Sequence, residues 1–396
     1  MSSHETQSMP AGTYRHTLLE RVVHGQPFEK AVADEVLAAG ARRVLIIASP
    51  RAHGSNALAR LRDALGDRLA GEFLHALPHV PVACVRDAAV LATQLNADHL
   101  VALGGGSVID AAKAIALLVR SGLPAQVAPL LDPQDLRLVD PGDRSMDDGR
   151  WLRITAVPQT LSAAEFTWFA GVSDPSRKIK NIVAHAAMAP RCVILDPVLT
   201  LEFPVPTFLA SGVKAIDHAV ERLVSQHSHP MSDALSLHAL RMLSQALPAV
   251  HETPGDLQAR QQCQLASWLS IAGGAAGVKA GASHALGHVL GAHAGIAHGL
   301  TSCVLLAPVL RWNEGHNRSQ QCRVMSALGV SGMGLGSWVG QMVSGLGLPT
   351  RLRELGVDKA DLPDIARKSL HDPGMRHNPR PIQSAADALE ILQDAW

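Results

Sequence analysis

The residues best suited to chemistry are histidines that cluster late in the chain, together with one lysine upstream of them. His284, His288 and His298 lie in the segment GASHALGHVLGAHAGIAH, and His218 lies in SGVKAIDHAVE, one helical turn after Lys214. Imidazoles spaced four residues apart share one face of a helix and could together hold a metal ion. Lys214 occupies the position at which a carboxylate would complete such a site, so its charge argues against a simple metal centre.

A second candidate site is a glycine-rich turn that could bind a dinucleotide. An apolar run leads directly into Gly104, Gly105, Gly106 and Ser107, and a helical pattern that contains Asp110 follows. Consecutive glycines let the backbone approach an anion, and the N-terminus of the next helix offers free N–H groups to a diphosphate. The segment is not the G-x-G-x-x-G fingerprint, so an ordinary strand-to-helix turn is the alternative.

Two further segments could complete a cofactor site. Thr160, Leu161 and Ser162 follow another predicted strand, where hydroxyls suit a pyrophosphate or a ribose, or simply cap a helix. An earlier β-rich run ends at Ser49 and Arg51, without the acidic residue that would bind the ribose of NAD and repel the phosphate of NADP. Because Arg51 could pair with that phosphate, we expect the protein to use NAD(H) or NADP(H) as its cofactor, without strict selectivity for NAD(H).

Alternating strand and helix patterns in the first half of the chain position these segments. Runs rich in β-branched or apolar residues predict strands within residues 42–49, 99–107, 151–160 and 189–197. Amphipathic patterns predict helices at residues 56–69 and 108–122. This alternation is typical of a parallel, doubly wound α/β sheet.

The pattern changes after residue 197, from where the segments carry helical periodicity. We therefore expect an α/β dinucleotide-binding domain over residues 1–199 and an all-α catalytic domain over residues 200–396. The Asp-, Pro- and Gly-rich residues 131–150 predict an exposed loop. Gly291 and Gly295 predict a helix break within the histidine segment. The ligand site is expected in the cleft between the two domains.

Composition excludes several classes of protein. The chain has 396 residues, 47% of them hydrophobic and 18% charged, with a formal net charge of zero. Two domains fit this length, and a nucleic-acid partner is not expected without a basic face. The five cysteines are scattered without C-x-x-C spacing, which indicates reduced thiols and a cytoplasmic protein. The polar N-terminus does not resemble a signal peptide, and no apolar run is long enough to span a membrane.

Taken together, several motifs resemble a known family. They include ADHLVALGGGS, VPQTLSAAEFT, CVILDPVLTL, SGVKAIDHAVE, SHALGHVLGAHAGIAHG and HNPRPI. In combination they are similar to the group III, iron-containing alcohol dehydrogenases and, within that family, to the maleylacetate reductases of aromatic catabolism. The resemblance implies an N-terminal dinucleotide-binding α/β domain and a helical C-terminal domain, the fold shared with dehydroquinate synthase, in a protein that is commonly a homodimer.

The resemblance also implies roles for individual residues. The segments that contain Gly104 to Ser107 and Thr160 to Ser162 fall on the family's cofactor-binding segments, and Lys180 falls on its nucleotide-side lysine. Three positions depart from the family pattern: Gln159 replaces a usual Thr, and Ala163-Ala164 replace a usual Gly-Ser pair. These departures concern details of cofactor binding and leave the expected fold unchanged.

In the second half, the resemblance assigns the histidines. His218, His284 and His298 fall on the three histidine ligands of Fe or Zn in metal-dependent relatives, and His288 falls on the histidine beside the nicotinamide. Lys214 falls on the fourth ligand, which is Asp in metal-dependent members and typically Asn in maleylacetate reductases.

An ammonium group at the fourth ligand position leads to a hypothesis about mechanism. We expect Lys214 to replace the ion as a fixed cation near a substrate oxygen, while His218, His284 or His288 donates a proton. In the alternative, Lys214 points to solvent and a metal is still held by His218, His284 and His298 with a water molecule.

The leading functional prediction is NAD(P)H-dependent reduction of a small keto or enone acid, such as maleylacetate to 3-oxoadipate. Three alternatives remain at this point. They are a metal-dependent alcohol dehydrogenase acting on another carbonyl or alcohol, an NAD-using lyase of the dehydroquinate synthase type, and a cofactor-binding protein without catalysis.

Overall fold

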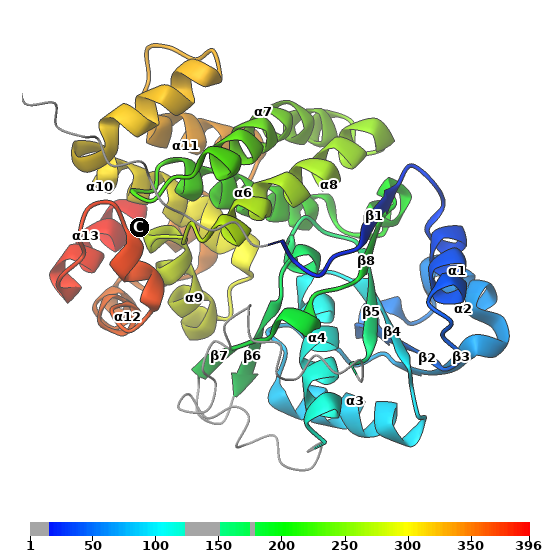
Figure 1. The fold of residues 1–396 in the computed structure, drawn as a ribbon. Helices are drawn as coiled ribbons and strands as arrows, with labels where there is room; N and C mark the ends of the chain where they lie inside the picture. Colours follow the sequence, from blue (N-terminus) through cyan, green and yellow to red (C-terminus); the bar gives the residue numbers. More distant parts are fainter. Residues whose placement is uncertain (1–15, 123–150, 175–178) are drawn as a thin grey trace, which may run out of the picture.

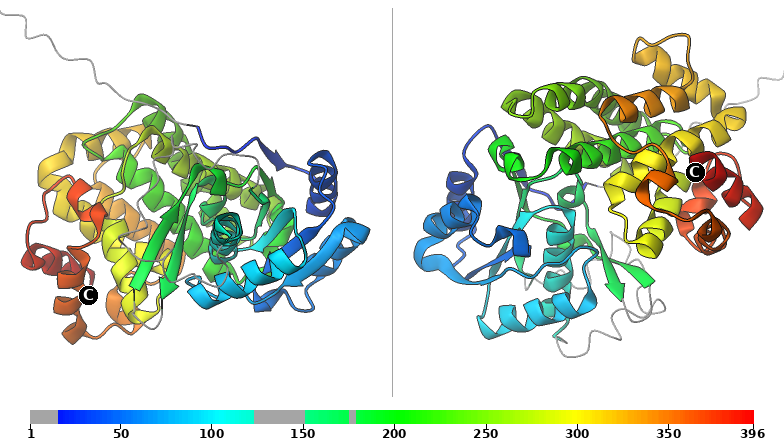
Figure 2. Two further views of the ribbon diagram at one scale, coloured as in Figure 1. Left: turned by 60° about the horizontal axis from the view of Figure 1, so that its bottom comes forward. Right: turned by 180° about the vertical axis from the view of Figure 1, so that it is seen from behind.

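The computed structural model describes residues 16–122, 151–174 and 179–396, without the side chains at positions 179, 180, 275 and 276. The loop expected at residues 131–150 lies outside the described residues. The described residues form a sheet part and a helical part that lie side by side (Figures 1 and 2).

The first part is built on a parallel sheet, as predicted, and the sheet has six strands. In spatial order its strands are β1 (Arg21–His24), β8 (Cys192–Leu195), β5 (Arg153–Pro158), β4 (His99–Gly104), β2 (Val44–Ala48) and β3 (Leu69–Phe73). Of these strands, β1 and β3 were not predicted. Every residue of β2 is buried, as is usual for a parallel strand that helices cover on both faces.

Four helices cover the two faces of this sheet. Helices α1 (Phe28–Ala38) and α2 (Asn56–Leu65) pack on one face, and α3 (Val82–Gln94) and α4 (Gly106–Ser121) pack on the other. Helix α4 ends where the sequence predicted, because Gly122 adopts the left-handed conformation at its C-terminus. A separate antiparallel pair, β6 (Phe169–Asp174) and β7 (Ile179–Ala184), was not predicted.

The second part is helical, as the periodicity predicted. Its helices in the described residues are α6 (Val205–Leu223), α7 (Pro230–Glu252), α8 (Leu257–Ala272), α9 (Ala282–Ala294), α10 (His298–Ala327), α11 (Leu335–Gly345), α12 (Leu362–Ser369) and α13 (Ala385–Ala395). The predicted break in the histidine segment is confirmed, because α9 ends before Gly295, whose φ is +67°, and α10 begins at His298. No helix in the described residues is both long and apolar enough to cross a membrane.

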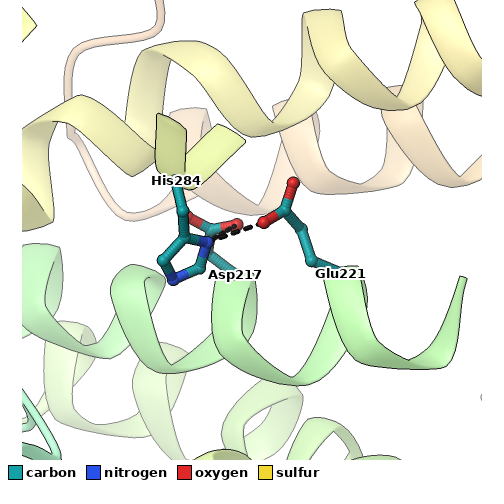
Figure 3. A group of neighbouring side chains, drawn as sticks. All are labelled: Asp217, Glu221 and His284. Carbon is teal, nitrogen blue, oxygen red and sulfur yellow. Dashed lines mark hydrogen bonds and ion pairs between the residues drawn. The ribbon is translucent and has the colours of Figure 1, made fainter. Parts of the chain in front are cut away.

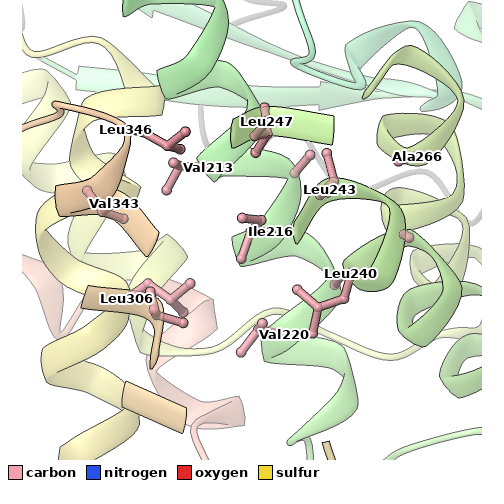
Figure 4. Packing of buried hydrophobic residues seen from close by; sticks show 14 of the residues in the cluster. Val213, Ile216, Val220, Leu240, Leu243, Leu247, Ala266, Leu306, Val343 and Leu346 are labelled. Atoms are coloured by element: carbon pink, nitrogen blue, oxygen red, sulfur yellow. The ribbon is translucent and has the colours of Figure 1, made fainter. Parts of the chain in front are cut away.

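Helix α6 lies at the centre of the helical part and is buried along most of its length. Val213, Ile216 and Val220 form an apolar stripe that packs against side chains of α7, α10 and α11 (Figure 4). A second stripe on the same helix is polar and carries Lys214, Asp217, His218 and Glu221. The hydrophobic core thereby fixes the direction in which the polar stripe points.

His99 of β4 makes stability depend on pH. Its ring is 1% exposed, and Nε2 lies 2.8 Å from the Thr155 hydroxyl on the neighbouring strand. Burial, helped by the charge of Arg153, lowers the pKa of His99 to about 4. The unfolded chain takes up a proton below about pH 6.5 and the folded chain does not, so stability falls as pH falls between these values.

We expect His99→Gln to flatten this dependence. Between pH 6.5 and 4.5 the unfolding free energy of the parent should fall by about 2–3 kcal/mol more than that of the variant. Urea unfolding at several pH values measures the difference. Parallel loss of stability in parent and variant would show that His99 does not stay neutral in the folded protein.

Candidate functional site

Four of the predicted histidines form a continuous group of rings. The rings of His218 on α6 and His284 on α9 are stacked, with their centroids 5.1 Å apart. His288 approaches His284 at 6.5 Å and His298, the first residue of α10, at 5.8 Å, both edge to face. The structure therefore brings together the side chains that spacing alone placed on two separate segments.

Lys214 lies within electrostatic reach of this group. Its side chain is 13% exposed, and Nζ lies 3.3 Å from Oδ2 of Asp217, three residues further along α6. Its charge contributes to the lowered pKa values of His218 and His288. The side chain is therefore turned into the protein, with its ammonium group held by a carboxylate.

Asp217 is a residue of the site that the sequence analysis missed. It is completely buried, and Oδ2 accepts hydrogen bonds from the hydroxyls of Ser302 at 2.6 Å and Ser283 at 3.1 Å as well as from Lys214. Burial alone would raise the pKa of Asp217, but the charges of His284 and Lys214 and the hydrogen bonds give a net lowering. The available signal was a carboxylate three positions after Lys214, on the same polar stripe of the helix.

Glu221, also missed, fixes His284 at the start of α9 (Figure 3). Oε2 accepts hydrogen bonds from His284 Nδ1 at 2.7 Å and the Gly281 amide at 2.8 Å, and Oε1 accepts one from the Ser283 amide at 2.9 Å. A carboxylate at a helix N-terminus satisfies free N–H groups and interacts favourably with the helix dipole. Glu221 thus orients both the helix and the imidazole ring.

The contacts of Asp217, Glu221 and His284 determine whether these three residues could bind a metal ion. In the part of the chain that the structure describes, the group of potential ligand atoms lying within 4.8 Å of one another belongs to Asp217, Glu221 and His284. The Glu221 oxygens are already occupied by N–H donors, and His284 Nδ1 is one of those donors. Glu221 and His284 therefore form a carboxylate–histidine pair, which fixes the His284 ring and leaves its Nε2 for other contacts.

Two of the histidines are held neutral near pH 7. Burial, followed by the charges of His284 and Lys214, lowers the pKa of His218 well below its usual value. Burial also lowers the pKa of His288, although Asp372, whose Oδ2 lies 2.9 Å from His288 Nδ1, opposes that shift. Neutral rings at these positions can accept hydrogen bonds but are poor sources of a proton.

The glycine-rich turn and the Thr160–Ser162 turn meet at the carboxyl edge of the sheet. A Cβ on Gly106, the first residue of α4, would lie 2.8 Å from Ser162 Oγ, and one on Gly105 would lie 3.3 Å from Thr160. The side chains of the second turn therefore pack against the start of α4, where residues 105–107 remain partly exposed, and the free N–H groups of this helix end suit a diphosphate. Residues 104–107 and 160–162 therefore lie together in one cradle, as the expected dinucleotide site requires.

Other residues expected at this cradle are engaged elsewhere. The Asp110 carboxylate pairs with Lys113 at 3.0 Å and accepts a hydrogen bond from the Gly171 amide, so it stabilises the junction with β6. The Leu161 side chain packs into the core of the helical part, and its amide donates to Ser211 Oγ at 2.9 Å. Leu161 therefore joins the cradle to the helical part.

The remaining residues expected to bind cofactor lie at other positions of the α/β part. Ser49 follows β2, and Arg51 is exposed in the next turn with its guanidinium 6.0 Å from the centre of the Phe203 ring. Both follow the carboxyl end of a parallel strand, which is the edge where ligands bind in open α/β sheets. Lys180 belongs to β7, but its side chain lies outside the described part.

We expect Gly106→Ala to weaken NADH binding. The added methyl group would overlap Ser162, and shifting the turn to relieve such crowding costs about 1–3 kcal/mol, equivalent to a roughly 5- to 150-fold rise in the dissociation constant. Fluorescence titration with NADH measures the change. Gly315→Ala, where a Cβ meets nothing within 4 Å, is the matched control. Equal affinity for NADH in parent, variant and control would show that this turn does not contribute to the cofactor site.

Both parts of the chain match family models. Residues 20–197 match the model described as iron-containing alcohol dehydrogenase, and residues 208–396 match the model described as the C-terminal part of the Fe-containing alcohol dehydrogenase family. The first match ends just after β8 and the second begins in the first turn of α6, where the sheet part gives way to the helical part.

Individual proteins are similar over nearly the full length. The maleylacetate reductase of Burkholderia cepacia is 31% identical over 374 residues, which cover 94% of each chain. The maleylacetate reductase of Sphingobium indicum is 31% identical over 363 residues, covering 91% of each chain. The crystal structure of maleylacetate reductase from Agrobacterium tumefaciens matches with a TM-score of 0.80 at 28% identity, covering 98% of this chain and 99% of that one.

Proposed function

We propose a substrate and a mechanism for this chain, which belongs to the iron-containing alcohol dehydrogenase family and is an NAD(P)-dependent oxidoreductase similar to maleylacetate reductases. The proposed substrate is a small enone acid with two carboxylates, such as maleylacetate, and the product is the saturated keto acid, such as 3-oxoadipate. The lyase and the non-catalytic alternatives are not retained, because the similar proteins are named reductases and dehydrogenases.

The proposed reaction adds a hydride and a proton across the carbon–carbon double bond of the enone. When bound, a reduced nicotinamide would supply the hydride, and the enone would accept it at its carbon furthest from the ketone. Electron density then moves to the ketone oxygen, which becomes an enolate. A proton delivered to the carbon beside the ketone restores the carbonyl group and completes the reduction.

Lys214 is the proposed partner of the enolate oxygen. An ammonium group has three N–H donors, and the contact with Asp217 uses one of them, so donors remain for the substrate. A fixed cation near an oxygen that gains negative charge stabilises the transition state more than the ground state. The ion pair with Asp217 supports this role because it keeps the ammonium group from turning to solvent.

His284 is the proposed proton donor. Its Nδ1 hydrogen is held by Glu221, with Asp217 Oδ1 3.6 Å away, so the ring is fixed in place and its Nε2, which no described residue hydrogen-bonds, is left for the substrate. His218 and His288 are less suited, because burial lowers the pKa of each ring. They are proposed to orient the substrate and nicotinamide instead.

The residues do not fit a divalent metal at the position used by metal-dependent relatives. At about 4 Å and an effective dielectric constant near 20, an ammonium group repels a divalent ion by roughly 8 kcal/mol. Lys214 cannot turn away from that position without breaking its ion pair with the buried Asp217. We therefore propose that the reaction proceeds without a metal.

The single observation that carries the proposal is the buried Lys214–Asp217 ion pair within the histidine group. The test combines an NADH and NADPH oxidation assay on maleylacetate, other keto acids and aldehydes with metal analysis of the purified protein before and after chelation. We expect turnover of maleylacetate that chelation does not reduce. One metal equivalent per chain, with activity lost on stripping, would support the metal-dependent alternative.

Four further points belong to the same proposal. Arg51 and the lack of an acidic residue beside it support use of NADPH as well as NADH. The cysteines described as free thiols support a cytoplasmic location.

We also propose two domains, which span residues 1–199 and 200–396. We propose in addition that the protein is a homodimer, which sedimentation would measure.

A further inference from the structure

His79 belongs to the α/β part but reaches the histidine group of the helical part. It lies between β3 and α3, at the same carboxyl edge of the sheet as the cofactor cradle. Its ring meets that of His298 edge to face, with the centroids 6.1 Å apart. His298 in turn contacts His288, so His79 extends the row of rings across the junction of the two parts.

The backbone that presents His79 adopts an unusual conformation. His79 and Val80 have φ values of +61° and +52°, a region that β-branched residues such as valine strongly disfavour. The surrounding structure holds them there: Val80 is 2% exposed, and its carbonyl accepts a hydrogen bond from the Ser173 amide at 2.9 Å. Strain of this kind concentrates where a side chain must be aimed at a ligand.

We infer that His79 binds a carboxylate of the substrate at the end of the histidine row that meets the α/β part, and so selects substrates with two carboxylates. The inference rests on the proposed function, because it assigns the carboxylate that lies beyond the ketone of that substrate. A substrate placed between the cradle and the histidine row must lie against residues of both parts. Among the described residues, His79 joins the row from the α/β part, and an imidazole can donate a charge-assisted hydrogen bond to a carboxylate.

The test compares two substrates that differ by one carboxylate. Maleylacetate carries two, whereas cis-4-oxopent-2-enoate keeps the same enone and lacks the carboxylate beyond the ketone. For His79→Ala we expect a KM for maleylacetate that is about 10- to 100-fold higher. The KM for the monocarboxylate, or its Ki where turnover is too slow, and the KM for NADH should stay within about twofold.

Two variants control for effects on the loop. His79→Asn keeps a residue that tolerates the left-handed conformation and should show the same selective loss even if His79→Ala folds poorly. His75→Ala removes an exposed histidine of the same connection, whose ring contacts Phe73 at 5.9 Å, and should leave both KM values unchanged.

The outcomes separate this inference from the proposed function. Equal effects of both His79 variants on the two substrates, or no effect on either, would overturn the role of His79 while leaving the reductase activity in place. A parent protein that reduces maleylacetate with neither NADH nor NADPH would overturn the proposed function and this inference together.

Discussion

Lys214→Ala should lower kcat for maleylacetate reduction by about 10²–10³-fold, the usual effect of removing one group that stabilises an oxyanion. The enolate oxygen would lose its only proposed cation, while the proposed nucleotide cradle is formed by residues 104–107 and 160–162 and does not include Lys214. The KM for NADH should therefore stay close to that of the parent. Steady-state kinetics with both substrates varied gives the two constants separately.

The control variants distinguish loss of the cation from damage to the buried network. Removing Lys214 leaves Asp217 with the Ser283 and Ser302 hydroxyls as hydrogen-bond donors. Asp217→Asn keeps the ammonium group but removes the ion pair, so it should lower kcat less than Lys214→Ala does. A thermal melt of each variant reports on folding. If Lys214→Ala turns over as fast as the parent while folded, the cation role is wrong.

Most of the fold could be predicted because its signals are local. Strands β2 and β4 are short apolar runs that end in turn residues, and α4 ends at a glycine in the left-handed conformation. Strand β3 was missed because each of its residues is only partly buried, so no buried or alternating pattern marks it. The β6–β7 pair was missed because an antiparallel pair depends on the register between two segments. The amino-acid composition of a segment does not reveal that register.

The histidines of the site could be predicted, but their partners could not. His284 and His288 stand out because their spacing places them on one helix face. Glu221 and Asp372 lie 63 and 84 residues from the histidines that they orient, so only the folded chain brings each pair together. Asp217 was near enough to be noticed, yet its importance depends on hydroxyls from α9 and α10 that the sequence does not place beside it.

Lys214→Asp should convert the site into one that binds a divalent metal. The substitution removes an ammonium group whose repulsion of a divalent ion amounts to roughly 8 kcal/mol at 4 Å, and it adds a carboxylate four residues before His218. Asp217 would then lie near a second carboxylate instead of a cation, and a divalent ion would offset both charges. We expect about one equivalent of Zn²⁺ per chain, with an affinity at least about 10³-fold above that of the parent.

The measurement is equilibrium dialysis against Zn²⁺ followed by metal analysis, which does not depend on activity. Lys214→Asn is the matched control, because it removes the positive charge without supplying a charged ligand, and it should bind more weakly than Lys214→Asp. Adding His218→Ala to the Lys214→Asp variant should abolish binding, since it removes the ligand on the same helix face. Equal Zn²⁺ affinity in the parent and in Lys214→Asp would mean that the ammonium group does not control this position. The metal-free mechanism would then lose its physical basis, and the histidines alone would have to account for the chemistry.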